Sequence, residues 1–216
     1  MRALASEAEV SIVKGLSRPF KVCFEGIDGC GKSTQVELLV RRLREEGLEA
    51  AVVKHPGFTR FGREVRKLLL SGAQADADLA SRLLFWADHI DAVANLPEAD
   101  VVVFDRHPRY SNYAYGAAMG TPVPVLVQLD DILSGFGAVP DLTFVIDVPA
   151  EVAWRRMEAR GGLTVIERRG LEYFRKVRHA YLELAEHYLE VAVVRGDGAP
   201  EAVHQKVLEF FGWLAA

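Results

Sequence analysis

The segment Gly26–Ser33, with the sequence GIDGCGKS, constrains the fold of this chain more than any other feature. Its glycines let the backbone curl so that successive N–H groups point inward, and a lysine and a serine close the pattern. The apolar run Phe20–Gly26 precedes it, and a stretch with apolar residues at helical spacing follows and stops at Gly47. A strand, a glycine-rich loop and a helix in this order cradle phosphate groups, because the helix adds its positive N-terminal end. The sequence therefore predicts an α/β protein that binds a nucleotide.

The rest of the chain alternates short apolar runs with longer amphipathic stretches. Further strands are predicted at Ala50–Lys54, Val101–Asp105, Leu142–Asp147 and Val191–Arg195. Further helices are predicted at residues 62–70, 78–96, 124–135, 150–160, 171–189 and 200–214. Continuous β-branched runs suit strands that are buried on both faces, and β-α alternation suits a parallel sheet. We therefore expect a P-loop NTPase-type, three-layer α/β/α fold with a five-stranded parallel sheet.

The composition disfavours several other classes of protein. Half of the 216 residues are hydrophobic, which is enough for a packed core, and 26 basic against 30 acidic residues leave a net charge of −4. This weakly acidic balance argues against a nucleic acid polymer as partner. Apolar runs are all shorter than the roughly 18 residues of a membrane helix, so no membrane partner is expected. The two cysteines, Cys23 and Cys30, form no metal-binding pattern, and a cytoplasmic location is predicted.

Three side chains carry the expected phosphate chemistry. The ammonium group of Lys32 can reach the β- and γ-phosphates of a bound triphosphate, and the Ser33 hydroxyl can ligate Mg²⁺. Asp105 ends an apolar run, and a carboxylate there is the usual second part of the Mg²⁺ site in such folds.

From Phe20 onward the chain resembles the thymidylate kinase family. The resemblance lies in six stretches, at residues 24–35, 56–70, 83–89, 105–118, 140–157 and 173–185. It implies transfer of a phosphoryl group from ATP to dTMP, which gives dTDP, with Mg²⁺ as cofactor and a homodimer as the assembly. It also implies one nucleoside monophosphate kinase-like domain over residues 19–216, with a short lid at about 160–169. Residues 1–18 are then an N-terminal extension.

The resemblance assigns most positions of the donor site. ATP-binding residues are implied at Gly26, Ile27, Asp28, Gly29, Cys30, Gly31, Lys32, Ser33, Thr34 and Arg156. Metal ligands are implied at Ser33, Asp105 and Glu167, and catalytic residues at Asp28, Lys32, Arg106, Arg160 and Arg168.

The acceptor site is assigned in the same way. Phe85 matches the aromatic residue that stacks on the base, and Arg106 matches the arginine that holds the acceptor phosphate. The remaining acceptor residues implied are Arg60, Phe61, His89, Asn112 and Tyr115. The tyrosine is expected to crowd out a 2′-hydroxyl and so to favour deoxyribose.

The chemistry needs no general base. A nucleoside monophosphate has a second pKa of about 6, so its phosphate is already a nucleophilic dianion at neutral pH. Catalysis then requires alignment and charge neutralisation by the loop lysine, Mg²⁺ and an arginine. Family members place this arginine in the phosphate loop or in the lid. Because the loop position here is Gly29, we expect the lid to supply it from Arg160, Arg168 or Arg169, with Arg160 preferred.

Several positions depart from the family pattern. Lys54-His55 stands where Arg-Glu is usual, and His89 replaces an arginine that donates to the thymine carbonyl. His107 follows Asp105-Arg106 where a tyrosine is usual, and Thr164-Val165 stands where many relatives carry Asp-Arg. Most of these changes affect the acceptor side or the lid. They raise the hypothesis of an altered base choice.

Two alternatives remain open at this point. One is a kinase for a different nucleotide, or for a nucleoside, on the same scaffold. A nucleoside hydroxyl needs a base such as Glu after the second strand, where this chain has His55. The other is a nucleotide-binding module with little turnover, which the retention of Lys32, Ser33 and Arg106 disfavours.

Overall fold

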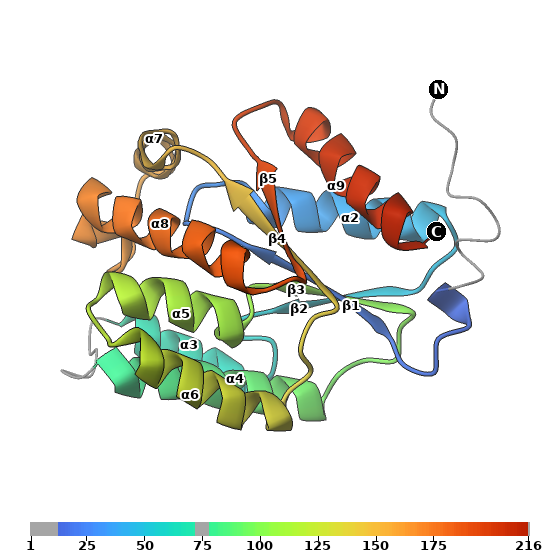
Figure 1. Ribbon diagram of the computed structural model, residues 1–216, viewed down its shortest axis with the longest axis horizontal. Coiled ribbons are helices and arrows are strands. Elements are labelled where there is room, and N and C mark those ends of the chain that lie inside the picture. The colour runs from blue at the N-terminus through green and yellow to red at the C-terminus, as the bar shows by residue number, and fades with distance from the viewer. Residues whose placement is uncertain (1–12, 72–77, 216) are drawn as a thin grey trace.

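Five parallel strands form one sheet at the centre of the molecule (Figure 1). The structure is a computed structural model that describes residues 13–71 and 78–215. The strands run in the order β2-β3-β1-β4-β5. Their bounds are β1 (Phe20–Glu25), β2 (Ala50–Lys54), β3 (Val101–Asp105), β4 (Leu142–Asp147) and β5 (Val191–Arg195). All five predicted strands are confirmed, and the first ends one residue earlier than expected.

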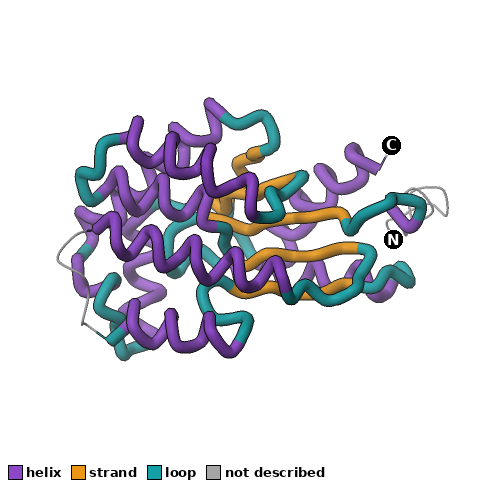
Figure 2. The backbone as a smooth tube through the Cα atoms, turned by 90° about the horizontal axis from the view of Figure 1, so that it is seen from below, coloured by secondary structure: helices purple, strands orange, loops and turns teal. Residues whose placement is uncertain are grey.

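Helices cover both faces of the sheet. Their bounds are α2 (Lys32–Glu45), α3 (Arg60–Leu70), α4 (Asp78–Ala94), α5 (Pro108–Ala118), α6 (Val123–Leu133), α7 (Ala150–Arg160), α8 (Leu171–His187) and α9 (Pro200–Ala215). Short 3₁₀ turns follow at Ser134–Phe136 and Glu167–Arg169. Helices α2 and α9 pack together on one face, and α4, α5, α6 and α8 lie on the other (Figure 1). Figure 2 shows the strands side by side among these helices. The predicted three-layer α/β/α architecture is confirmed.

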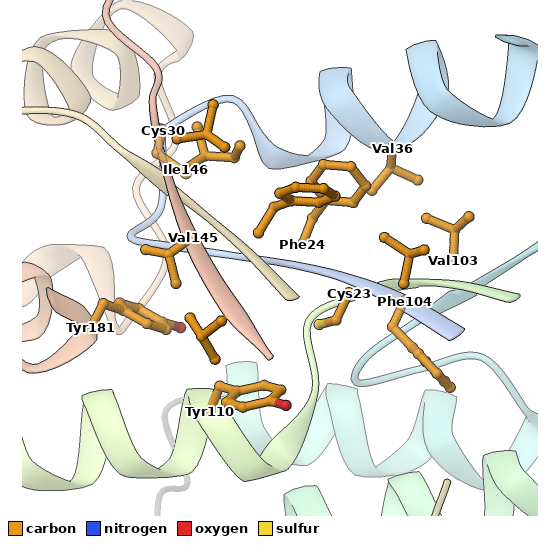
Figure 3. Close-up of a cluster of buried hydrophobic side chains, with 14 of the residues drawn as sticks. Cys23, Phe24, Cys30, Val36, Val103, Phe104, Tyr110, Val145, Ile146 and Tyr181 are labelled. Carbon is orange, nitrogen blue, oxygen red and sulfur yellow. The ribbon is translucent and has the colours of Figure 1, made fainter. Parts of the chain in front are cut away.

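The core lies on both faces of the three inner strands. Every residue of β3 is buried, whereas the edge strands β2 and β5 alternate buried and more exposed residues. Figure 3 shows Phe24 beside Val36 of α2 on one face, while Cys23 lies on the opposite face towards Tyr110 of α5. The expectation of strands buried on both faces therefore holds for the inner strands only, because an edge strand lacks one neighbour.

Helix α5 is the one helix among the described residues that the sequence pattern does not predict. Its residues 110–116 are all buried, because α4, α6 and α8 surround it. A helix that is buried on nearly every side shows no amphipathic stripe, so the 3.6-residue periodicity is lost. His107 begins the helix, since its Nδ1 accepts a hydrogen bond from the backbone N–H of Arg109 at 3.1 Å.

Small differences at helix ends have local causes. Helix α3 begins at Arg60, two residues before the expected start, because the Thr59 hydroxyl caps it by accepting from the N–H of Gly62 at 2.9 Å. The predicted N-terminal extension lies mostly outside the described residues. Within its described end, Arg18 forms an ion pair of 2.6 Å with Asp141. None of the described helices is long and apolar enough to cross a membrane.

Candidate active site

The loop between β1 and α2 forms one end of the site. Gly31 precedes α2 with a φ of 102°, and among the described residues no side chain caps this helix. The first N–H groups of α2 therefore remain available to an anion. Lys32 Nζ donates to the carbonyl oxygens of Gly26 and Ile27 at 2.9 Å each. Its ammonium group thus lies within the loop, as phosphate binding requires.

Gly29 is closed to any side chain. Its φ is +79°, and a Cβ atom built there would lie 2.6 Å from the carbonyl oxygen of Ala153 and 3.1 Å from Met157. Both neighbours belong to α7, whose backbone would have to move. An arginine at this loop position is sterically excluded, which supports the prediction that the lid supplies it.

A serine and an aspartate meet at the start of α2. Ser33 Oγ donates to Asp105 Oδ2 at 3.0 Å, and Lys54 Nζ lies 3.6 Å from the same oxygen. Hydroxyl and carboxylate oxygens are ligands that suit Mg²⁺. No group of three or more His, Cys, Asp or Glu side chains in the described ranges forms a metal cage. A magnesium ion here would therefore take its other ligands from phosphate oxygens and water.

Arg106 lies at the centre of a dense polar network. It follows β3 with a φ of 78°, which is uncommon for a residue other than glycine. Its guanidinium group donates to Asp28, to the hydroxyl of Tyr115 at 3.1 Å and to the hydroxyl of Tyr181 at 3.2 Å. Glu25 lies 3.6 Å from Arg106 and is fully buried. These contacts hold the guanidinium group toward the phosphate loop.

The charge states in this network follow from burial and from the arginine. Burial raises the pKa of Glu25 above its ordinary value, although Arg106 opposes this. Burial alone would also raise the pKa of Asp28, but Arg106 and Lys32 outweigh it and lower that pKa. Asp28 is therefore ionised at neutral pH and balances the positive charge that an acceptor phosphate would meet.

A cavity of about 900 Å³ connects the phosphate loop to helix α4. It brings together many of the residues that the sequence singled out. The predicted site residues that line it are Asp28, Gly29, Gly31, Lys32, Ser33, Thr34, Phe85, Asp105, Arg106, Tyr115, Arg156, Arg160 and Glu167.

Other predicted residues do not line this cavity. Those that fall outside its lining are Gly26, Ile27, Cys30, Arg60, Phe61, His89, Asn112 and Arg168. Gly26, Ile27 and Cys30 belong to the buried backbone of the phosphate loop. Phe61 is 49% exposed on α3, so the structure does not bring it to the acceptor site. Arg60 is also exposed.

His89 departs from its predicted role as a base-binding residue. Its side chain is completely buried, and its Nδ1 lies 3.1 Å from Nε2 of His55, which in turn bonds Asp88 at 2.7 Å. The ring of His107 lies 4.1 Å away, measured between centroids. Burial, and then His55, holds the pKa of His89 well below its ordinary value, so the ring is neutral. An imidazole is too short to extend from this position into the cavity as an arginine would.

The three histidines that depart from the family pattern therefore form one buried cluster, with Asp88 at its edge. Asp88 also accepts from the N–H of Gly57 at 2.9 Å, so it holds the chain that follows β2. No spacing rule in the sequence connects positions 55, 89 and 107, which only the fold brings together.

Asn112 contains a buried acceptor that has no partner among the described residues. Its Nδ2 donates to the carbonyl oxygen of Arg82 at 3.1 Å, which fixes the orientation of the amide because a carbonyl can only accept. The Oδ1 atom is then left unpaired, although Asn112 is only 4% exposed. A buried unpaired acceptor is costly and suits a site that a donor on a ligand completes. Asn112 follows Ser111, which lines the cavity.

The lid is held by one carboxylate. Glu167 is 2% exposed, and its Oε1 accepts from Arg160 at 2.6 Å while its Oε2 accepts from the N–H of Thr164 at 2.7 Å. Arg160 and Arg169 line the cavity, but Arg168 instead donates to the carbonyl oxygen of Leu163 at 3.2 Å. The structure therefore favours Arg160 over Arg168. The metal-binding role of Glu167 stays a prediction, since both of its oxygens bind within the lid.

Several cavity residues were not assigned to the site from the sequence. These include Lys54, Arg66, Asp78, Ser81, Arg82, Met119 and Tyr173. Asp78, Ser81, Arg82 and Phe85 recur at helical spacing on one face of α4. That spacing was the available signal, because it places polar residues on the same face as the expected stacking aromatic.

One cavity thus joins a triphosphate loop to a pocket whose guanidinium group faces that loop. A phosphate loop and a second, arginine-bearing pocket in one cavity are the features of P-loop nucleoside monophosphate kinases. Comparison with known proteins narrows the class. The thymidylate kinase family model matches residues 24–207, and the chain belongs to this family.

Individual relatives agree along nearly the whole chain. A probable thymidylate kinase of Pyrococcus abyssi is 36% identical over 200 residues, which cover 88% of this chain and 95% of that protein. The thymidylate kinase of Fervidobacterium nodosum is 34% identical over 195 residues, or 88% of this chain and 97% of the relative. The crystal structure of thymidylate kinase from Ehrlichia chaffeensis superposes with a TM-score of 0.69 at 26% identity, and covers 89% of this chain and 97% of that one.

Proposed function

We propose that this chain transfers the γ-phosphoryl group of ATP to dTMP, which gives ADP and dTDP. The observation that carries this proposal is the shared cavity, in which the phosphate loop and Arg106 face each other across Asp28. Membership of the thymidylate kinase family supports the choice of substrate.

The chain's own residues supply alignment and charge. Lys32 and the N–H groups of α2 hold the triphosphate, and Arg106 holds the acceptor phosphate, whose dianion attacks without a protein base. Ser33 and Asp105 would hold Mg²⁺, which when bound neutralises charge on the β- and γ-phosphates. Arg160 reaches the transferring group only after it leaves Glu167. Closure of the lid then excludes water and prevents idle hydrolysis of ATP.

We infer that the amide of Asn112 selects the acceptor base, although Asn112 does not line the cavity in this structure and its Oδ1 must be uncovered when a nucleotide binds. Once uncovered, the unpaired Oδ1 would accept from an imino N–H, which thymine and uracil carry at N3 and which cytosine and adenine lack. A nucleoside acceptor is disfavoured, because His55 is 1% exposed and its Nδ1 bonds Asp88, so it cannot serve as the base.

A panel of acceptors tests the proposed function. With ATP as donor, kcat/KM for dTMP is expected to exceed that for dCMP and dAMP by at least about 100-fold, since those bases leave Oδ1 unpaired. A coupled assay of ADP release measures kcat/KM for each acceptor, and dUMP, dGMP and thymidine are tested as further acceptors. Equal rates with dCMP, or a higher rate with thymidine, would refute dTMP as the substrate.

The assembly and location follow as further proposals. Leu79 and Leu83 of α4 are 38% and 45% exposed and lie one turn apart, which suits a homodimer contact. Sedimentation velocity is expected to give twice the 23.9 kDa chain mass, and a single-chain mass would contradict it. Cys23 and Cys30 are free and buried, in keeping with a reducing cytoplasm.

A further inference from the structure

The residue at position 89, the buried His89, does not supply the acceptor pocket with a hydrogen-bond donor for a carbonyl oxygen of the base. Thymine presents its N3–H between two carbonyl oxygens, O2 and O4. Asn112 Oδ1 matches the N–H but can match neither carbonyl, because an amide oxygen does not donate. His89 is enclosed by other aromatic rings, and a Cβ at Gly137 would lie only 2.7 Å from it. A donor for a carbonyl oxygen must therefore come from another residue that lines the cavity.

Arg82 is a cavity residue whose side chain can supply such a donor. It lines the cavity and precedes Phe85 by three residues, so the two side chains are neighbours on one face of α4. Its backbone carbonyl binds Nδ2 of Asn112 at 3.1 Å. The backbone of Arg82 is thus bonded directly to the amide that is proposed to bind the imino group.

The guanidinium group of Arg82 is held by one edge only. Asp78 accepts from its Nε at 3.2 Å and from its Nη2 at 2.9 Å, and Thr121 donates to Asp78 at 2.8 Å. The side chain of Arg82 is 14% exposed. No hydrogen bond to Nη1 is formed by the residues that the structure describes, and Nη1 is not buried without a partner. A fixed arginine with free N–H groups that border a cavity is preorganised to donate.

We propose that Arg82 determines base specificity by donating from Nη1 to one of the two carbonyl oxygens that flank N3 of the acceptor base. This inference rests on the proposed function for the identity of the base. If Arg82 had a purely structural role and only braced Asp78 and Thr121, replacing it would not change the size of any response to the atom at O2 or O4.

A double-mutant cycle between the protein and the ligand tests the proposal. Binding of dTMP, 2-thio-dTMP and 4-thio-dTMP is measured by calorimetry for the wild type and for Arg82→Met, since sulfur is a weak acceptor. One thio substitution is expected to weaken wild-type binding roughly 10-fold and to change binding to the variant less than about 2-fold. Arg41→Met, on the exposed face of α2, is the matched control and should retain the full wild-type response.

Each result decides the proposal. A thio effect of the same size in wild type and variant, for both analogues, overturns it, and so does failure of the wild type to bind dTMP. If Arg82→Met does not fold, the double variant Asp78→Asn/Arg82→Met takes its place in the cycle. This variant removes both charges of the ion pair, so no carboxylate is left unpaired. Turnover is measured separately. If the thio effect depends on Arg82 but no phosphoryl transfer to dTMP is measured, the proposed function is refuted and the role of Arg82 in binding the base stands.

Discussion

Replacing Lys32 with methionine is expected to lower kcat for dTMP phosphorylation by roughly a thousandfold. The ammonium group lies within the phosphate loop, 2.9 Å from two of its carbonyl oxygens, where it is proposed to neutralise charge on the transferring group. A methionine keeps the length of the side chain but carries no charge. Steady-state ADP release at saturating ATP and dTMP measures the loss.

Lys67→Met provides the control for this experiment. Lys67 lies on α3 with a side chain that is 72% exposed, and it does not line the cavity. Its loss should leave kcat within about twofold, as for most exposed substitutions. If Lys32→Met kept a tenth or more of wild-type turnover, the phosphate loop would not be the donor site.

Replacing Arg160 with alanine is expected to lower kcat by about 10³–10⁵-fold, the range for arginines that stabilise charge in phosphoryl transfer. Gly29 excludes an arginine from the loop, and Arg160 lines the cavity at the end of α7. Because Arg160 is proposed to act on the transferring group, KM for dTMP should change much less than kcat. Single-turnover transfer from labelled ATP measures the chemical step.

Arg155→Ala, on an exposed position of the same helix, is the matched control for lost charge. If the Arg160→Ala variant kept the single-turnover rate of the wild type, Arg160 would have no part in the mechanism. A large loss in Arg169→Ala alone would instead assign the role to the other lid arginine that lines the cavity.

The fold was predictable because its signals are local. The glycine spacing of Gly26–Ser33 is enough to indicate a phosphate-binding loop, and each strand is a mostly apolar run between turns. Helix α5 was not predictable, since burial on nearly all sides removes the periodicity on which such a prediction depends.

The donor site was predictable for the same reason, whereas the acceptor pocket was only partly so. Position 89 matches a base-binding arginine along the chain, but whether a shorter side chain still reaches the cavity depends on His55 and His107, which come from other elements. The proposed contribution of Arg82 to base binding depends on how Asp78 orients its guanidinium group. No sequence motif indicates an ion pair of this kind.

The closed space at Gly29 limits how this chain can change. Moving the assisting arginine from the lid into the loop would require a new side chain at position 29 and, at the same time, a displaced backbone at Ala153. Either change alone yields a chain with a steric clash or a chain with a gap and no added arginine. In this chain, the two arrangements are therefore not connected by a single substitution at position 29, because an arginine added there would also require α7 to move away from the loop.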